Sequence, residues 1–173
     1  MTHRSLVLAL ALALALAACS AAATVSSAAG ASTTKQQFTI TSATAAGKNS
    51  PTRVMADGAI TGRGTVDVKS SHDSRIDHMT LHLGKGTVFL VAVEKSYAVH
   101  PEPAKCLATA LGRGTFKVTA GTGSFRDAHG SGTYLRHGVL YGARNTAGAC
   151  LGRSAPIAKT TVRVNMTGTV SLG

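Results

Sequence analysis

The stretch TVRVNMTGTVSL, residues 161–172, alternates between apolar and polar side chains over most of its length. The apolar side chains share one face, which holds Val162, Val164, Met166, Val170 and Leu172. Alternation with a period of two is typical of a β-strand that has one face in a core and the other in solvent. We therefore expect a strand here, with this apolar face turned inward.

The same alternation recurs along the chain, interrupted by clusters of Gly, Asn, Asp and Ser. Further strands are expected at 36–44, 53–62, 64–69, 76–83, 87–95, 114–120 and 132–144. No segment after residue 35 has helical periodicity. About eight strands with short turns favour a single closed antiparallel β-barrel, because closure removes exposed strand edges. A two-sheet β-sandwich is the alternative.

The pattern also predicts which side chains point inward, which strand is covered on both faces and where the long loops lie. The inward side chains expected in 64–69, 76–83 and 114–120 are Val66, Val68, Met79, Leu81, Leu83, Phe116 and Val118. Segment 87–95 is apolar on both faces, so both faces should be covered. Segments 98–106 and 151–159 contain proline and include or adjoin a cysteine, and we expect them to be long loops.

The N-terminus has the pattern of an export signal. Arg4 precedes an apolar run at 6–18 that is too short for a membrane-spanning helix. The run leads into LAAC, residues 16–19, which resembles a bacterial lipobox. We therefore predict that residues 1–18 are a lipoprotein signal peptide and that lipidation of Cys19 anchors the protein to the cell membrane, outside the cytoplasm. An ordinary secretory signal, cut at a nearby alanine, is the alternative.

Residues 19–35 consist mainly of Ala, Ser, Thr and Gly. This composition cannot bury a core, so the segment is predicted to be a flexible tether. Residues 36–173 suffice for one β-barrel domain with a modest core. An exported chain favours a disulfide between Cys106 and Cys150. The alternatives, a reactive thiol pair or metal ligands, lack a Cys-x-x-Cys pattern or a nearby histidine.

The chain is basic, with 18 Lys and Arg against 7 Asp and Glu. Such an excess favours anionic partners, for example lipid headgroups or cell-wall polymers. The positive residues are scattered along the sequence, and aromatic residues make up only 4% of it. Because single-stranded nucleic acid is bound by stacking on aromatic side chains, nucleic acid is not an expected partner.

The stretch GTGSFRDAHGSGTY, residues 121–134, is rich in glycine but has neither the Gly-Lys-Ser/Thr of a P-loop nor the strand–helix context of a dinucleotide fingerprint. A tight turn between strands fits better. Its structural residues are Gly121, Gly123, Phe125, Gly130 and Gly132. The first two glycines are expected to adopt positive φ, the phenylalanine to plug the barrel end, and the last two glycines to let the next strand bend.

This stretch resembles the signature turn of the allene oxide cyclase/dirigent barrel superfamily, in which Gly-x-Gly-x-Phe/Tyr is followed by a second glycine motif. It is most similar to small exported actinobacterial members, which also have a cysteine on either side and a closing strand like VNMTGTVSL, residues 164–172. The resemblance covers residues 112–142 and the last strand. It implies an eight-stranded antiparallel barrel with a cavity for a small hydrophobic molecule. Plant members steer cyclisation or radical coupling there, but their polar cavity residues are not matched here, so no activity is carried over.

Polar residues on an inward face would mark such a cavity. In segment 132–144, His137 and Tyr141 share a face with a leucine and a valine, so this face is expected to point inward and the face of Tyr134 outward. Glu94 continues the apolar face of segment 87–95 and is the third cavity candidate. The alternative is an ordinary core histidine and tyrosine, each satisfied by one hydrogen bond, and a carboxylate at a strand end.

His78 and His82 have the spacing of zinc ligands on a helix, but on a strand their Cα atoms would lie about 13 Å apart. No metal site and no cofactor is therefore predicted. No Ser-His-Asp order, paired-carboxylate spacing or nucleophile elbow is present. The expected function is non-enzymatic: binding of a small apolar ligand in the barrel, or a role as an envelope surface module. The alternatives are a cyclase- or dirigent-like enzyme and a basic module that binds anionic wall polymers.

Overall fold

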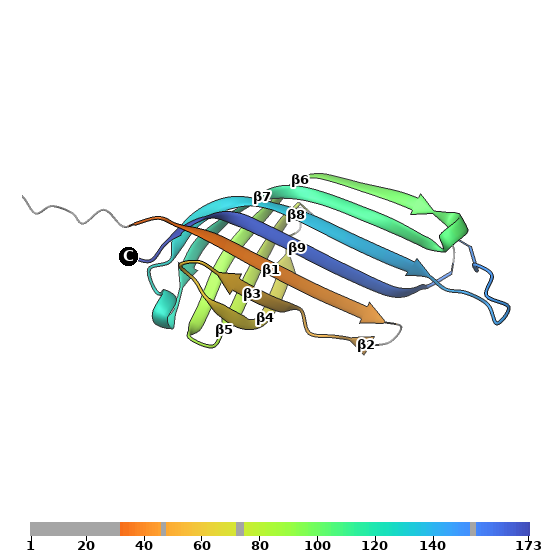
Figure 1. Ribbon diagram of the computed structural model, residues 1–173, viewed down its shortest axis with the longest axis horizontal. Coiled ribbons are helices and arrows are strands. Elements are labelled where there is room, and N and C mark those ends of the chain that lie inside the picture. Colours follow the sequence, from red (N-terminus) through yellow and green to blue (C-terminus); the bar gives the residue numbers. More distant parts are fainter. Residues whose placement is uncertain (1–31, 46–47, 72–74, 153–154) are drawn as a thin grey trace, which may run out of the picture. The chain divides into compact units, whose positions relative to one another are not determined.

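The computed structural model describes residues 32–45, 48–71, 75–152 and 155–173 (Figure 1). The predicted signal peptide, the predicted lipidation site Cys19 and the tether up to residue 31 lie outside the described residues. Within the described ranges, no helix is long and apolar enough to cross a bilayer.

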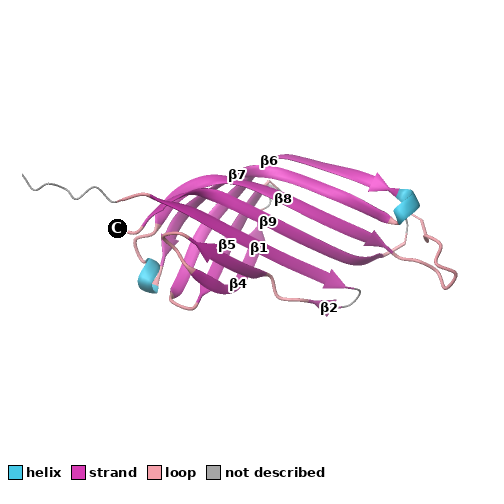
Figure 2. Cartoon of the chain, in the orientation of Figure 1, coloured by secondary structure: helices cyan, strands magenta, loops and turns pink. Residues whose placement is uncertain are grey.

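Most of the described chain is β-strand (Figure 2). The strands are β1 (Thr34–Ala45), β2 (Lys48–Asn49), β3 (Arg53–Asp57), β4 (Gly62–Ser70), β5 (Ile76–Leu83), β6 (Gly86–Glu102), β7 (Leu107–Gly121), β8 (His129–Gly142) and β9 (Ile157–Ser171). Two short 3₁₀ helices, η1 (Pro103–Lys105) and η2 (Gly123–Phe125), lie on either side of β7 in the chain. The first strand begins two residues before the end of the predicted tether.

The sheet runs in the order β1-β3-β4-β5-β6-β7-β8-β9 with every pairing antiparallel, and β9 pairs back with β1. These eight strands form a closed barrel, which confirms the predicted fold class and rules out the sandwich. β2 adds only a two-residue pairing at the end of β1.

Five strands are longer than the closed barrel requires. β5 pairs with β6 as far as Val93, and the Glu94 N–H still donates to the Arg75 carbonyl at 2.7 Å. From Ser96 onward β6 pairs with β7 alone. β6, β7, β8, β9 and β1 therefore continue past the shorter strands β3, β4 and β5 as a curved extension, which we call the arm (Figure 1). The loop predicted at 98–106 is wrong in its first part, because Pro101 pairs with Ala108 within β6. Proline is tolerated there because β6 is an edge strand in the arm.

A disulfide lies at the tip of the arm. Cys106 and Cys150 are bonded, with their Cα atoms 5.6 Å apart, which confirms the predicted pairing. The bond joins the residue after η1 to the connection between β8 and β9. The loop predicted at 151–159 is wrong in its second part, because β9 begins at Ile157.

The inner faces of the barrel strands form one apolar core. Its larger members are Phe38, Ile40, Val54, Ile60, Val66, Met79, Leu81, Leu83, Val88, Leu90, Phe116, Val118, Phe125, Tyr134, Val164, Met166 and Val170. The inward faces predicted for the strands are confirmed at most positions, but Val68 and Leu172 are exposed. Phe89 is 37% exposed on the outer face, so the expectation that both faces of 87–95 are covered is wrong. The barrel interior is filled by side chains.

The turn between β7 and β8 seals one end of the barrel. Phe125 is 3% exposed and packs into the core, which confirms that it plugs this end. Gly123 has a positive φ of +60°, as expected, whereas Gly121 does not. A Cβ atom at Gly121 would instead collide with the Phe125 backbone, and Cβ atoms at Gly130 and Gly132 would collide with the backbone of β9. These three glycines allow close backbone approach.

A buried glutamine fixes the same end. The Gln36 side chain is 2% exposed, and its Nε2 donates to the Ile60 carbonyl at 3.0 Å while its Oε1 accepts from the Ile60 N–H at 2.8 Å. The amide thus pairs both backbone groups of a residue in the β3–β4 turn, which would otherwise be buried without partners.

We predict that Phe125→Ala lowers the free energy of unfolding by about 3–5 kcal/mol, because it leaves a cavity in a filled core. Urea unfolding followed by circular dichroism measures this. The matched control is Phe89→Ala on the outer face, for which we expect a loss of at most about 1 kcal/mol. Equal losses would show that the turn does not plug the barrel.

Candidate functional site

Two glycines of β7 make room for a group of polar side chains on the inner face. Gly112 is paired with Tyr97 of β6 and Arg136 of β8, while Gly114 is paired with Glu94 and Tyr134 of the same two strands. We call these four side chains, Glu94, Tyr97, Tyr134 and Arg136, the mouth cluster. It lies where the barrel opens into the arm.

Both glycines are required by the side chains above them. A Cβ atom at Gly112 would lie 2.7 Å from Glu94 Oε1 and 3.2 Å from Arg136 Nε. At Gly114, it would lie 2.1 Å from the Val93 carbonyl oxygen and 2.6 Å from Cε1 of Tyr134. The bare backbone of β7 therefore lets side chains from β6 and β8 meet across it.

A β-bulge brings the two β6 members of the cluster to the same face. Glu94 is opposite Gly114, whereas Ser96 is opposite Arg113, so Lys95 is an extra residue in β6. Residues three apart on a regular strand would point to opposite faces. The bulge therefore turns both Glu94 and Tyr97 inward.

An ion pair and a cation–π contact connect three members of the cluster. Arg136 Nη2 lies 2.7 Å from Glu94 Oε1, with side-chain exposures of 30% and 16%. The guanidinium lies 4.9 Å from the centroid of the Tyr97 ring. Glu94 Oε1 is buried, and among the described residues it meets Arg136 as an ion pair without a hydrogen bond. The carboxylate is neutralised but keeps capacity to accept a hydrogen bond.

Tyr134 supplies a neutral phenol next to this ion pair. Its side chain is 6% exposed. Burial raises the pKa of Tyr134, the Glu94 carboxylate and more weakly Asp77 raise it further, and Arg136 lowers it. No hydrogen bond of the Tyr134 hydroxyl contributes to this shift in pKa, and among the described residues the hydroxyl is not one of the buried unpaired atoms, so it reaches solvent. It therefore stays protonated at neutral pH and is free to donate.

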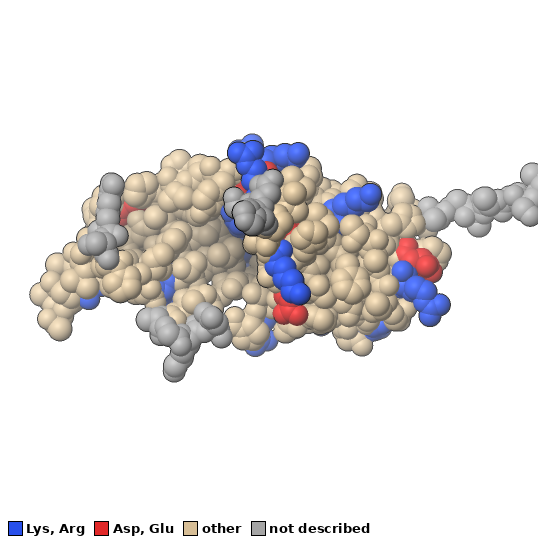
Figure 3. Space-filling view, turned by 180° about the vertical axis from the view of Figure 1, so that it is seen from behind, with Lys and Arg blue, Asp and Glu red and all other residues tan. Residues whose placement is uncertain are grey.

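The inner face of the arm continues from the cluster as an apolar wall. Tyr97 is 51% exposed and Val99 46% exposed. Val99 is followed across the sheet by Ala110 and Gly138, whose small size leaves the wall open. Seen from behind, the surface is hollowed where the arm leaves the barrel (Figure 3).

The wall leads to an apolar groove near the tip of the arm. This groove has a volume of about 260 Å³. Its lining includes Pro101, Leu140, Ile157 and the Cys106–Cys150 disulfide. Arg144 holds the adjoining loop by donating to the carbonyls of Gly148 at 2.7 Å and Lys105 at 3.0 Å.

The expected inward positions of His137 and Tyr141 are wrong. Both are exposed on the outer face, together with Leu135, which is 63% exposed, while Tyr134 points into the core. The face of β8 that points inward is the opposite of the predicted one. The small residues on the inner face of β7 leave room there for the large polar side chains of β8. Glu94 does lie on the inner face, so the three cavity candidates do not meet in one lumen.

The outer-face histidines of β5 do not form a metal site. His78 and His82 are both exposed, and His82 Nε2 lies 3.0 Å from Asp67 Oδ2. In the part of the chain that the structure describes, no group of three or more His, Cys, Asp or Glu side chains is placed to hold a metal ion.

Sequence reasoning missed Tyr97, Tyr134 and Arg136. Tyr97 faces inward because of the bulge at Lys95, and no residue type in this part of the sequence predicts a bulge. For the other two, the Gly-x-Gly at 112–114 could have indicated that large side chains cross β7 from the neighbouring strand.

We predict that Gly112→Ala lowers the free energy of unfolding by about 1–3 kcal/mol, because the new methyl group displaces the Glu94–Arg136 pair. Urea unfolding measures this, with Gly84→Ala as the control, since a Cβ at Gly84 meets nothing within 4 Å. Adding Glu94→Ala to Gly112→Ala removes the clash and should cost less than the sum of the two single changes. An additive result would contradict the clash.

Comparison of the chain with protein-family models, with curated proteins and with solved structures finds no match.

Proposed function

We propose that the protein binds a small, uncharged, mainly apolar molecule that carries a hydroxyl or carbonyl group. The observation that carries this proposal is the Tyr134 hydroxyl, which reaches solvent and sits at one end of an exposed apolar wall. A phenol whose ring is buried and whose hydroxyl is free to donate gains a hydrogen bond to a ligand oxygen at little cost in side-chain entropy.

The charges of the cluster favour an uncharged ligand. Glu94 and Arg136 neutralise each other, and Asp77 is close enough to Tyr134 to raise the pKa of its phenol. An anion would be repelled by the two carboxylates, and a cation would have to displace or oppose Arg136. A neutral oxygen can accept from Tyr134, and a ligand hydroxyl can donate to Glu94.

The apolar part of the ligand would lie against the arm. Tyr97 and Val99 are about half exposed there, and covering them removes apolar surface from water. Because the barrel interior is filled, the ligand would bind at the mouth and along the arm, not inside the barrel. The resemblance to allene oxide cyclase/dirigent barrels supports a small hydrophobic ligand.

We propose binding in preference to catalysis because the only inward-facing cavity candidate, Glu94, is engaged by Arg136. The other two, His137 and Tyr141, lie on the outer face. The enzyme alternative that needed all three in one lumen has therefore lost two of its residues.

We also propose that the protein works outside the cytoplasm, anchored through a lipid on Cys19. The lipobox-like residues 16–19 and the Cys106–Cys150 disulfide support this location, since disulfides persist in oxidising compartments.

Ligand binding is tested by native mass spectrometry of the gently purified protein. We expect an added mass that is lost on denaturation. Tyr134→Phe should bind the ligand up to about tenfold more weakly than the unchanged protein, because one hydrogen bond is lost. The fraction of protein that carries the added mass should fall accordingly. Tyr141→Phe on the outer face is the control and should bind as the unchanged protein does. A bare mass in every sample, or equal effects of the two changes, would refute the proposal.

Membrane anchoring is tested by expressing Cys19→Ala in an exporting bacterial host. The unchanged chain should sediment with membranes and incorporate a labelled fatty acid, and Cys19→Ala should do neither. Ser20→Ala serves as the control and should behave like the unchanged chain. Fatty-acid incorporation by Cys19→Ala would contradict the assignment.

A further inference from the structure

The outer face of four adjacent strands is basic and free of carboxylates. β7, β8, β9 and β1 contain no Asp or Glu. Their exposed cations are Lys35, Arg113, Lys117, Lys159 and Arg163, to which β3 adds Arg53 next to β1. We call this surface the basic face. Six of the Lys and Arg side chains that are scattered in the sequence thus share one side of the sheet.

The cations of the basic face lack ion-pair partners. In the described parts of the chain, the ion pairs are His82–Asp67, Lys105–Glu102 and Arg136–Glu94. Arg75, which also has an interaction partner, lies outside the basic face. None of these involves the basic face. The carboxylate of β3, Asp57, is exposed on the same face at the opposite end of that strand from Arg53. Unpaired cations on β7, β8, β9 and β1, which carry no carboxylate, give a positive potential that an anionic partner can use.

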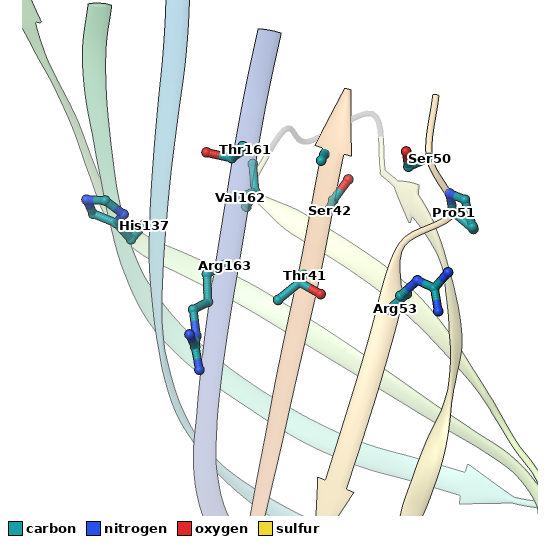
Figure 4. A pocket seen from close by; sticks show the side chains of 10 residues that line it. Thr41, Ser42, Ser50, Pro51, Arg53, His137, Thr161, Val162 and Arg163 are labelled. Carbon is teal, nitrogen blue, oxygen red and sulfur yellow. The ribbon is translucent and has the colours of Figure 1, made fainter. Parts of the chain in front are cut away.

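One row of the basic face shows how the charges are spaced. His137, Arg163, Thr41 and Arg53 are successive register partners on β8, β9, β1 and β3. They line a shallow groove of about 520 Å³ on the outer face, to which Ser50 also contributes (Figure 4). With strands about 4.8 Å apart, the backbones at Arg163 and Arg53 are separated by about 10 Å.

Hydrogen-bonding groups fill the space between these cations. Arg163 donates through Nε to Asn165 Oδ1 at 3.3 Å, which leaves the outer nitrogens of its guanidinium available. The uncharged polar side chains exposed around it on the same face are Gln37, Thr41, Thr115, Ser131, Thr133, Asn165, Thr167 and Thr169. Separated charges amid hydroxyls suit a long chain with repeated anionic groups better than a single small anion.

From this arrangement we propose that the basic face binds a linear, hydroxyl-rich polyanion, laid across β7, β8, β9, β1 and β3. Each arginine would contact an anionic group of the polymer, and the threonine and asparagine side chains would bond its hydroxyls. The repeated anion can be a phosphodiester or a carboxylate. This surface is distinct from the mouth cluster, which lies on the inner face of β6 and β8.

Binding is measured by fluorescence anisotropy with three labelled chains, namely poly(glycerol phosphate), polygalacturonate and oligothymidylate. The test variant is Arg53→Gln/Arg113→Gln/Arg163→Gln. The control is Lys69→Gln/Lys85→Gln/Arg126→Gln, which removes the same charge from exposed positions outside the basic face. Circular dichroism confirms that each variant is folded.

We expect the unchanged protein to bind one or both hydroxyl-rich polymers, with affinity falling steeply as salt rises. The test variant should bind at least tenfold more weakly, with a log–log salt slope reduced by about 2. The control should lose less than threefold. Arg53→Lys/Arg113→Lys/Arg163→Lys keeps the charges and should retain most of the binding, which gives a readout even if the glutamine variant unfolds.

Preference between the phosphodiester and the carboxylate polymer identifies the anion. Equal loss in test and control variants would mean that net charge alone attracts the polymer, and it would overturn the assignment to this face. Binding of oligothymidylate as tightly as the other two chains would overturn the polymer class. Tyr134→Phe should leave polymer binding unchanged. Polymer binding on the basic face and small-ligand binding at the mouth cluster can therefore fail independently of each other.

Discussion

The pairing of β1 with β9 is the constraint on which the rest of the structure depends. It runs from Thr34 opposite Val170 to Ala45 opposite Lys159, and it joins the first and last long strands into a closed sheet. Closure gives the barrel strands partners on both sides, so the interior can be filled with apolar side chains without unpaired backbone groups. It also brings Arg163 of β9 and Arg53 of β3 to either side of β1.

The mouth cluster is an exception within this apolar interior. A charged pair in a partly buried position is costly unless its partners are well placed, and the chain meets this requirement with two local departures from regular strand structure. Gly112 and Gly114 remove side chains from β7, and the bulge at Lys95 re-aims β6. Sites where local rules of strand design are broken are common places for ligand binding, and here both departures serve the same four residues.

The sequence was sufficient for the barrel but not for the site. Period-two alternation identified the inward residues of β5, β7 and β9, such as Leu81, Phe116 and Met166, because those strands have one apolar and one polar face. In β8 both faces carry apolar and polar residues, so the apolar Leu135 did not indicate correctly which face of the strand points inward. Beyond the bulge, the face of Tyr97 could not be predicted from spacing, since the extra residue is visible only in the pairing with β7. Pro101 suggested a loop because proline is rare inside a sheet. It is tolerated in β6 because β5 ends earlier and leaves this part of β6 at the edge, which the sequence does not show.

The free edge of the arm has a consequence for how copies of the protein meet. From Ser96 to Glu102, β6 is paired on one side only, which would ordinarily offer a template for another chain to extend the sheet. Pro101 lacks the N–H that such an added strand would need, and the bulge at Lys95 interrupts the regular spacing of donors just before this segment. The edge is therefore poorly suited to stacking identical copies into fibrils. Many copies can be crowded side by side without their sheets merging.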